Sequence, residues 1–124
     1  MPGVRVRSAS SLVAAVVLVL GCASGAGPSQ TQPPGALYLS ADNVAFVQHT
    51  VQAPADSAFQ LYFENLENVP HNLNVAAATG ASVAKTEVFS GPAGHVLEVP
   101  ALATGTYKLL CEVHPEMFSQ LFVR

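Results

Sequence analysis

The chain has 124 residues, of which 50% are hydrophobic and only 10% are charged, and its formal net charge is −3. Once the first 22 residues are set aside as a targeting segment, three basic side chains remain against eight acidic ones, a net charge of −5. This balance argues against nucleic acid as a partner, because nucleic-acid binding depends on basic side chains that neutralise phosphates. The acidic residues are scattered along the chain, which is typical of a solvated surface.

Residues 1–22 have the pattern of a secretory signal. Two arginines precede an apolar run of nine residues, 12–20, which is shorter than the ~20 residues of a membrane-spanning helix and suits the core of a signal peptide. The run ends in Val-Leu-Gly-Cys22, which resembles the lipobox of bacterial lipoproteins. This resemblance implies a lipid on Cys22 and an exported chain, anchored to a bacterial membrane and facing the periplasm or the cell exterior. The alternative is an ordinary signal peptide cut near Ala23 or Ala26.

The segment that follows the signal differs from the rest of the chain. Residues 23–35 are small, polar and rich in proline and glycine, a composition that predicts a flexible linker between membrane and domain. Residues 36–124 remain, enough for one compact domain with a modest core and too few for two.

Within residues 36–124 the apolar residues alternate with polar ones, which is the period of a β-strand with one buried face. Short alternating segments are separated by proline, glycine, asparagine and aspartate, which favour turns. Strands are predicted over residues 36–39, 44–51, 59–64, 71–75, 85–89, 95–99, 107–111 and 119–123. The pattern predicts an all-β fold, a Greek-key β-sandwich of seven to eight strands. Only residues 76–84 leave room for one or two helical turns.

A thiol, an imidazole and a thioether follow one another at intervals of three residues in Cys111, His114 and Met117. A soft thiolate, imidazole and a weak thioether suit copper, and a second histidine would complete the set. His71 is the candidate, because it is in phase with inward-pointing Leu73 and so should face the core. Zinc is the main competitor for a site with one cysteine and two histidines, although a methionine ligand favours copper.

The remaining cysteine and histidines bear on this site. If Cys22 carries lipid, the thiol of Cys111 has no partner, and metal binding would protect it in an oxidising compartment. His49 and His95 are isolated in the sequence and are interpreted as surface or second-layer residues. Four histidines in all limit the chain to a single copper ion and exclude the cluster of a multicopper oxidase.

The motif GTYxxxCxxHPxM, followed by an apolar strand and preceded by Pro-His71-Asn72, resembles the cupredoxins, the small blue copper proteins. The short spacings in its ligand loop are similar to those of amicyanins. The resemblance implies a β-sandwich in which His71, Cys111 and His114 bind copper in a plane and Met117 is a weak axial ligand. It also implies that Asn72 ties the ligand loop in place.

Two departures from the family pattern stand beside the ligands. Val113 occupies a position that is often proline in the loop. Glu112 and Glu116 are acidic and flank the site, so they could raise the affinity for a cation or alter the potential.

The expected function is that of a membrane-anchored, extracytoplasmic one-electron carrier and not of an enzyme, acting as a monomer with redox proteins as partners. Phe118 is predicted to be partly exposed near the metal and to contribute to docking, because it is out of phase with the inward-facing Leu121 and Val123. The alternative function is copper storage, delivery or buffering with the same ligands. A third possibility is a module that kept this fold for structure or protein interaction.

Overall fold

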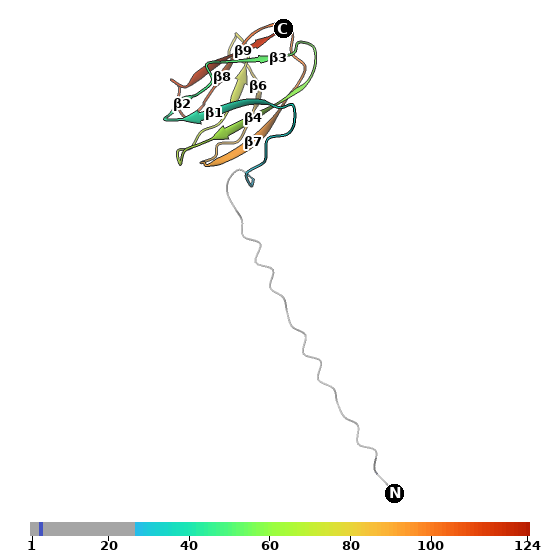
Figure 1. Ribbon diagram of the computed structural model, residues 1–124, viewed down its shortest axis with the longest axis vertical. Coiled ribbons are helices and arrows are strands. Elements are labelled where there is room, and N and C mark those ends of the chain that lie inside the picture. Colours follow the sequence, from blue (N-terminus) through green and yellow to red (C-terminus); the bar gives the residue numbers. More distant parts are fainter. Residues whose placement is uncertain (1–2, 4–26) are drawn as a thin grey trace.

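The computed structural model describes residue 3 and residues 27–124, and the latter form a two-layered β-sandwich (Figure 1). The first sheet has four strands in the order β2-β1-β4-β7, and the second has five in the order β3-β9-β8-β5-β6. The nine strands are β1 (Leu37–Asp42), β2 (Ala45–Phe46), β3 (Thr50–Ala53), β4 (Phe59–Asn65), β5 (Asn74–Ala76), β6 (Ser82–Lys85), β7 (Ala93–Val99), β8 (Gly105–Leu110) and β9 (Phe118–Val123).

The predicted all-β sandwich is confirmed, with nine strands in place of the expected seven to eight. Within the described part of the chain there is no α-helix. The possible helical turns over 76–84 are therefore wrong. Ala76 ends β5 and residues 82–84 belong to β6. The tight turn between these strands is closed by the amide of Ala77, which donates to the carbonyl of Ala81 at 2.8 Å.

The strand predicted over 44–51 is divided between the two sheets. β2 pairs with β1, whereas β3 runs parallel to β9 in the other sheet. Gln48 lies between them and joins both layers: its side-chain oxygen accepts from the amide of Ser40 at 2.7 Å, and its carbonyl accepts from the hydroxyl of Ser119 at 2.6 Å. The chain passes from one sheet to the other at Gln48, so residues 44–51 cannot form a single continuous strand.

The strand predicted over 85–89 also differs from the structure. β6 begins earlier and ends at Lys85. Phe89 makes only an isolated antiparallel bridge with His71, and His71 itself precedes β5 instead of belonging to it. The bridge nevertheless fixes the backbone on both sides of the predicted ligand.

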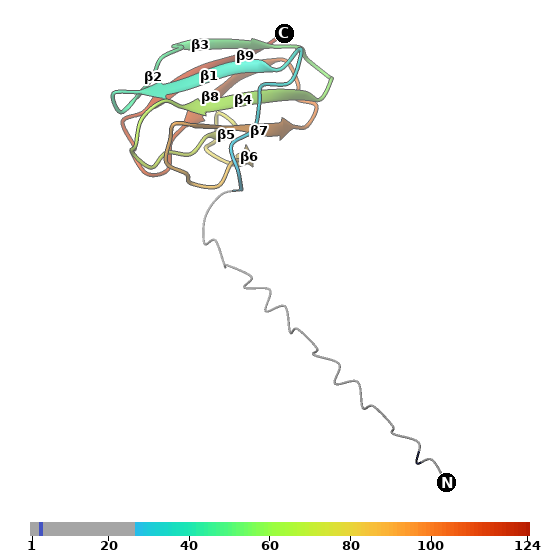
Figure 2. The same cartoon turned by 60° about the horizontal axis from the view of Figure 1, so that its bottom comes forward.

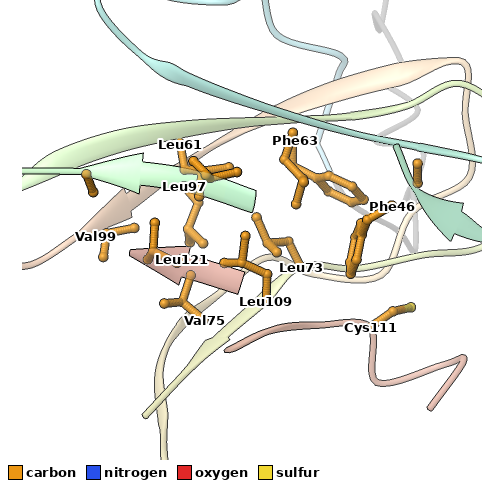
Figure 3. Close-up of a cluster of buried hydrophobic side chains, with 14 of the residues drawn as sticks. Phe46, Leu61, Phe63, Leu73, Val75, Leu97, Val99, Leu109, Cys111 and Leu121 are labelled. Atoms are coloured by element: carbon orange, nitrogen blue, oxygen red, sulfur yellow. The ribbon is translucent and has the colours of Figure 1, made fainter. Parts of the chain in front are cut away.

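The core lies between the two sheets and is made of aliphatic and aromatic side chains. Figure 3 shows Cys111 at one end of this cluster, on the side of Phe46 and away from Val99. β9 illustrates how the core forms, because its buried residues alternate with exposed or half-buried ones along the strand. Burying one large apolar side chain of this kind contributes about 1.5–3 kcal/mol. The fully buried members include Leu39, Leu61, Phe63, Leu73, Val75, Leu109 and Leu121.

The end of the predicted linker lies against the edge strand β7. The amide of Gln30 donates to the carbonyl of Gly94 at 2.7 Å, its side-chain oxygen accepts from the amide of Val96 at 2.7 Å, and its carbonyl accepts from the hydroxyl of Tyr62 at 3.0 Å. These contacts cover part of the β7 edge and attach residues just before the domain to it.

The predicted signal segment, apart from Gly3, and the lipobox cysteine lie outside the described residues. Among those that are described, no helix is long and apolar enough to cross a membrane.

Candidate metal centre

Cys111 follows the last residue of β8 and is 97% buried, with 3% of its surface exposed. The alternation of β8 carries it inward, as the sequence predicted, because Leu109 on the same face is fully buried. Within the described residues its thiol forms no disulfide. The amide of Cys111 donates to the carbonyl of Met117 at 3.3 Å and the amide of Met117 to the carbonyl of His114 at 2.9 Å. These bonds close the loop on itself.

His71 reaches the same end of the sandwich from a distant part of the chain. Its amide donates to the carbonyl of Phe89 at 3.1 Å, and the amide of Phe89 donates back to the carbonyl of His71 at 2.9 Å. The imidazole is completely buried. The predicted inward orientation of His71 is thus confirmed. The two backbone hydrogen bonds to Phe89 hold the residue in the position from which its ring faces the ligand loop.

Three donor atoms converge at this point. The Sγ atom of Cys111 lies 3.8 Å from Nδ1 of His71 and 3.8 Å from Nδ1 of His114, and the two Nδ1 atoms are 3.1 Å apart. All three lie within 4.8 Å of one another. A metal ion at about 2.0 Å from each nitrogen and about 2.3 Å from sulfur fits near the plane of such a triangle. The donors therefore form a trigonal site that is already assembled in the protein.

Met117 supplies the fourth predicted donor. It is 2% exposed and belongs to the same buried cluster as Cys111. Two imidazoles and a thiolate with a methionine nearby are the donor set of blue copper sites, whereas structural zinc sites are closed by cysteine, histidine or carboxylate. The chemistry of the residues therefore fits copper, and the axial role of Met117 stays a prediction.

The ring of His71 has a second contact that sequence reasoning missed. Its Nε2 atom lies 2.7 Å from Oε1 of Glu67, a carboxylate that also accepts from the amide of Val44 at 2.8 Å. The bond to His71 is the main reason that the pKa of Glu67 is lowered from its ordinary value. A carboxylate here holds the proton on Nε2 and leaves Nδ1 free to bind metal. In the sequence, this contact is indicated only by the position of an acidic residue, Glu67, four residues before His71.

Asn72 lies where the resemblance places it, next to the first ligand and 1% exposed. Its Oδ1 accepts from the amide of Glu112 at 2.8 Å, and its Nδ2 donates to the Glu112 carboxylate at 2.7 Å. Lys85 binds the same carboxylate at 3.1 Å, and this contact, followed by the one from Asn72, lowers the pKa of Glu112. The residues directly after His71 and Cys111 are thereby joined.

The other predicted residues lie outside the triangle. His49 is exposed, and His95 packs edge-on against Phe89 with ring centroids 4.2 Å apart. Neither belongs to the metal-binding group that the described residues contain, in agreement with their interpretation as surface or second-layer residues. Phe118 is 63% exposed beside buried Met117. Its role in docking remains a prediction, as does the lipid on Cys22.

The ligand loop lies at the same end of the sandwich as β2 (Figure 2). A surface groove of about 510 Å³ separates the two and is lined by Val44, Ala45, Phe46, His49, Thr50, Glu116, Met117, Phe118 and Gln120. His114 is partly exposed in the loop. Of the three donors in the triangle, it is the one that reaches the protein surface.

Several solved structures share this fold. Auracyanin from Roseiflexus castenholzii is 18% identical, with 79% of this chain and 99% of that chain covered and a TM-score of 0.64. Auracyanin A, a "blue" copper protein from Chloroflexus aurantiacus, is 18% identical with coverages of 72% and 98% and a TM-score of 0.63. Amicyanin from Paracoccus versutus is 17% identical, with coverages of 75% and 85% and a TM-score of 0.59.

A search of curated protein sequences gave no match. A family model described as a cupredoxin-like domain, in contrast, matches residues 11–123, which is most of the chain. Together with the nine-stranded sandwich and the converging donors of His71, Cys111 and His114, this match shows that the chain belongs to the cupredoxin-like family.

Proposed function

We propose that this protein is a type 1 copper protein that carries single electrons outside the cytoplasm, held at a membrane by a lipid on Cys22. The observation that carries the proposal is the triangle of donor atoms of His71, Cys111 and His114, all within 4.8 Å of one another. Copper bound there would supply a one-electron couple between Cu(I) and Cu(II).

The protein holds its donors in place before any metal arrives. His71 and Cys111 are buried, and each is tied by its backbone to a neighbouring segment, Phe89 for the former and Met117 for the latter. The bonds of His71 join two separate segments of the chain, and that of Cys111 closes the ligand loop on itself, so the donors cannot spread without breaking these bonds. A site that changes little between two oxidation states suits electron transfer, because little reorganisation accompanies it.

The partly exposed ring of His114 is the proposed route for electrons. Exposed Phe118 and Val113, at 63% and 39%, lie on the same loop or directly after it, and they would form the apolar contact surface for a redox partner. We expect the partner to be another protein and the carrier to be a monomer. The reach from the membrane would come from the part of the predicted linker 23–35 that precedes Ser29, because Ser29 and Gln30 are already bound to β7.

The decisive experiment records visible absorption and electron paramagnetic resonance spectra of residues 23–124 after addition of Cu(II). An intense thiolate-to-copper band that is lost in Cys111→Ser supports the proposal, since serine keeps the size of the side chain but removes the soft ligand. A colourless protein that binds only Cu(I) and exchanges it readily would favour storage or delivery. Failure to bind copper would overturn both functions.

Membrane attachment needs a separate test in cells. The full chain should partition with membranes and incorporate labelled fatty acid, and Cys22→Ser should abolish both. An exported, soluble wild-type protein would instead support an ordinary signal peptide cut near Ala23 or Ala26.

A further inference from the structure

Glu112 directly follows Cys111 and has its carboxylate bound on two sides. Oε2 accepts from Nδ2 of Asn72 at 2.7 Å, and Nζ of Lys85 lies 3.1 Å from Oε1 and 3.4 Å from Oε2. The amide of Glu112 in turn donates to Oδ1 of Asn72 at 2.8 Å. We call Lys85, Glu112 and Asn72, joined by these four hydrogen bonds, the carboxylate clamp.

The clamp connects the positions next to two metal ligands. Asn72 follows His71 and is 1% exposed, so its amide group is held in one orientation. Beside it, the amide of Leu73 donates to Oγ1 of Thr86 at 3.0 Å, and the amide of Thr86 donates to the carbonyl of Leu73 at 2.9 Å. Lys85 precedes Thr86 and ends β6, so its backbone position is set by the same segment that bears His71.

The same contacts determine how the negative charge of Glu112 acts on the metal site. Both of its oxygens are bonded to Lys85 or Asn72, and Glu112 is not among the described residues whose donor atoms converge on the metal site. A negative charge one residue from the thiolate would on its own favour the more highly charged Cu(II). Lys85 places an opposite charge within 3.1 Å of that carboxylate and offsets the effect.

We infer that Lys85 and Glu112 are positioning residues that set the reduction potential of the metal site, by clamping Asn72 between the two ligand segments and by keeping this flank electrically neutral. The inference rests on the proposed copper function. The Lys85–Glu112 pair is half-exposed, with side-chain exposures of 53% and 43%, and pairs of this kind contribute little to folding. Its effect should therefore be seen at the metal site and not in overall stability.

The test is the midpoint potential of three variants, Lys85→Met, Glu112→Gln and the double variant. Lys85→Met exposes the carboxylate charge and should lower the potential, whereas Glu112→Gln leaves a lysine without its partner and should raise it. Each single change should alter the ratio of Cu(II) to Cu(I) affinity by at least about twofold, which is about 18 mV for a one-electron couple. The double variant should return close to the wild-type value, because both charges are gone.

Lys108→Met is the matched control, since Lys108 is an exposed lysine on β8 that takes no part in the clamp. Equal potentials in Lys85→Met and Lys108→Met would overturn the inference, as would a Glu112→Gln protein with the wild-type potential. A wild-type protein that forms no blue copper site would instead defeat the proposed function, so the two failures are distinguishable.

A second measurement needs no metal. In the metal-free protein the side-chain amide signals of Asn72 in nuclear magnetic resonance spectra should move in Glu112→Gln, because the charged acceptor at 2.7 Å becomes a neutral one. They should stay unchanged in Lys108→Met. Unmoved Asn72 signals in Glu112→Gln would contradict the clamp even if the potentials shift.

Discussion

Glu67 and His71 are joined by a hydrogen bond of 2.7 Å between Oε1 and Nε2, on the side of the ring away from the metal-binding nitrogen. The ring is completely buried, and the carboxylate is only 18% exposed. A carboxylate in this position makes the imidazole a stronger donor and adds negative charge close to the site. Both effects favour Cu(II) over Cu(I).

Replacing this carboxylate should raise the midpoint potential. Glu67→Gln keeps an oxygen that can accept from the ring but removes the charge, and we expect Cu(II) affinity to fall by about tenfold relative to Cu(I). For a one-electron couple this is a rise of about 59 mV, measurable by redox titration of the blue band. Glu64→Gln, which removes a carboxylate bonded to Tyr38 instead, is the control. Equal potentials in the two variants would refute the role of Glu67.

The buried thioether of Met117 should tune the site without being needed to form it. Met117→Leu keeps the volume of a side chain that is 2% exposed, so the metal-free protein should lose less than about 1.5 kcal/mol of stability. Loss of a weak axial donor should leave the blue colour, shift the spectrum and raise the potential. Spectra and potential identical to those of wild type would show that Met117 is a packing residue only.

Exposed Phe118 should affect the rate of electron exchange with a redox partner, and it should not affect the potential of the metal site. Truncating an aromatic anchor in an interface commonly costs more than about 1 kcal/mol, so Phe118→Ala should slow electron exchange with a partner by about fivefold. The potential should not change, since the ring is 63% exposed. Thr104→Ala, which alters an exposed residue just before β8 and so at the other end of that strand from Cys111, is the control. A slower rate in both variants would argue against a docking role.

Gly91 sits where a side chain cannot be accepted. A Cβ atom there would collide with the backbone carbonyl of Asn65 and come within 2.9 Å of the carbonyl of Glu67, and the amide of Gly91 already donates to that second carbonyl at 2.9 Å. Because backbone would have to move, Gly91→Ala should destabilise the metal-free protein by about 1–3 kcal/mol in urea unfolding. Gly27→Ala, where a Cβ meets nothing within 4 Å, should be neutral.

His95 should make stability depend on pH. Burial lowers the pKa of His95 in the folded protein, so the unfolded chain, with a pKa of about 6.5, binds the proton more readily. Above the unfolded pKa, His95 is neutral in both states and the folded protein keeps its full stability. As the pH falls below that value, the unfolded chain takes up the proton first, and stability is lost until the pH has passed the folded pKa. Lys85 and Glu87 line the same groove as His95 and are the charged groups beside it.

The measurement compares urea unfolding of metal-free wild type and His95→Gln between about pH 5 and pH 7.5. The variant should lose less stability on acidification than the wild type. His49→Gln, which alters an exposed histidine, should keep the wild-type profile. Parallel profiles for wild type and His95→Gln would contradict the prediction.

The residue pattern alone determined the fold class and the metal-binding group. Alternation of apolar residues reports which side of a strand is buried, so it predicted a β-sandwich, the inward orientation of His71 and Cys111, and the outward phase of Phe118. Donor chemistry is also a local property, since the softness of a thiolate or thioether does not depend on the fold. The three-residue spacing of the ligand loop was therefore enough to indicate copper.

Only the tertiary structure decided how distant segments meet. The strand predicted over 44–51 changes sheets at Gln48 because its hydrogen-bond partners, Ser40 and Ser119, lie in different layers, and periodicity carries no information about partners. The same holds for Glu67 and for the clamp around Glu112. Whether a carboxylate near a site is a free charge, a ligand or a hydrogen-bond partner depends on groups 4 and 40 residues away, and folding alone brings those groups together.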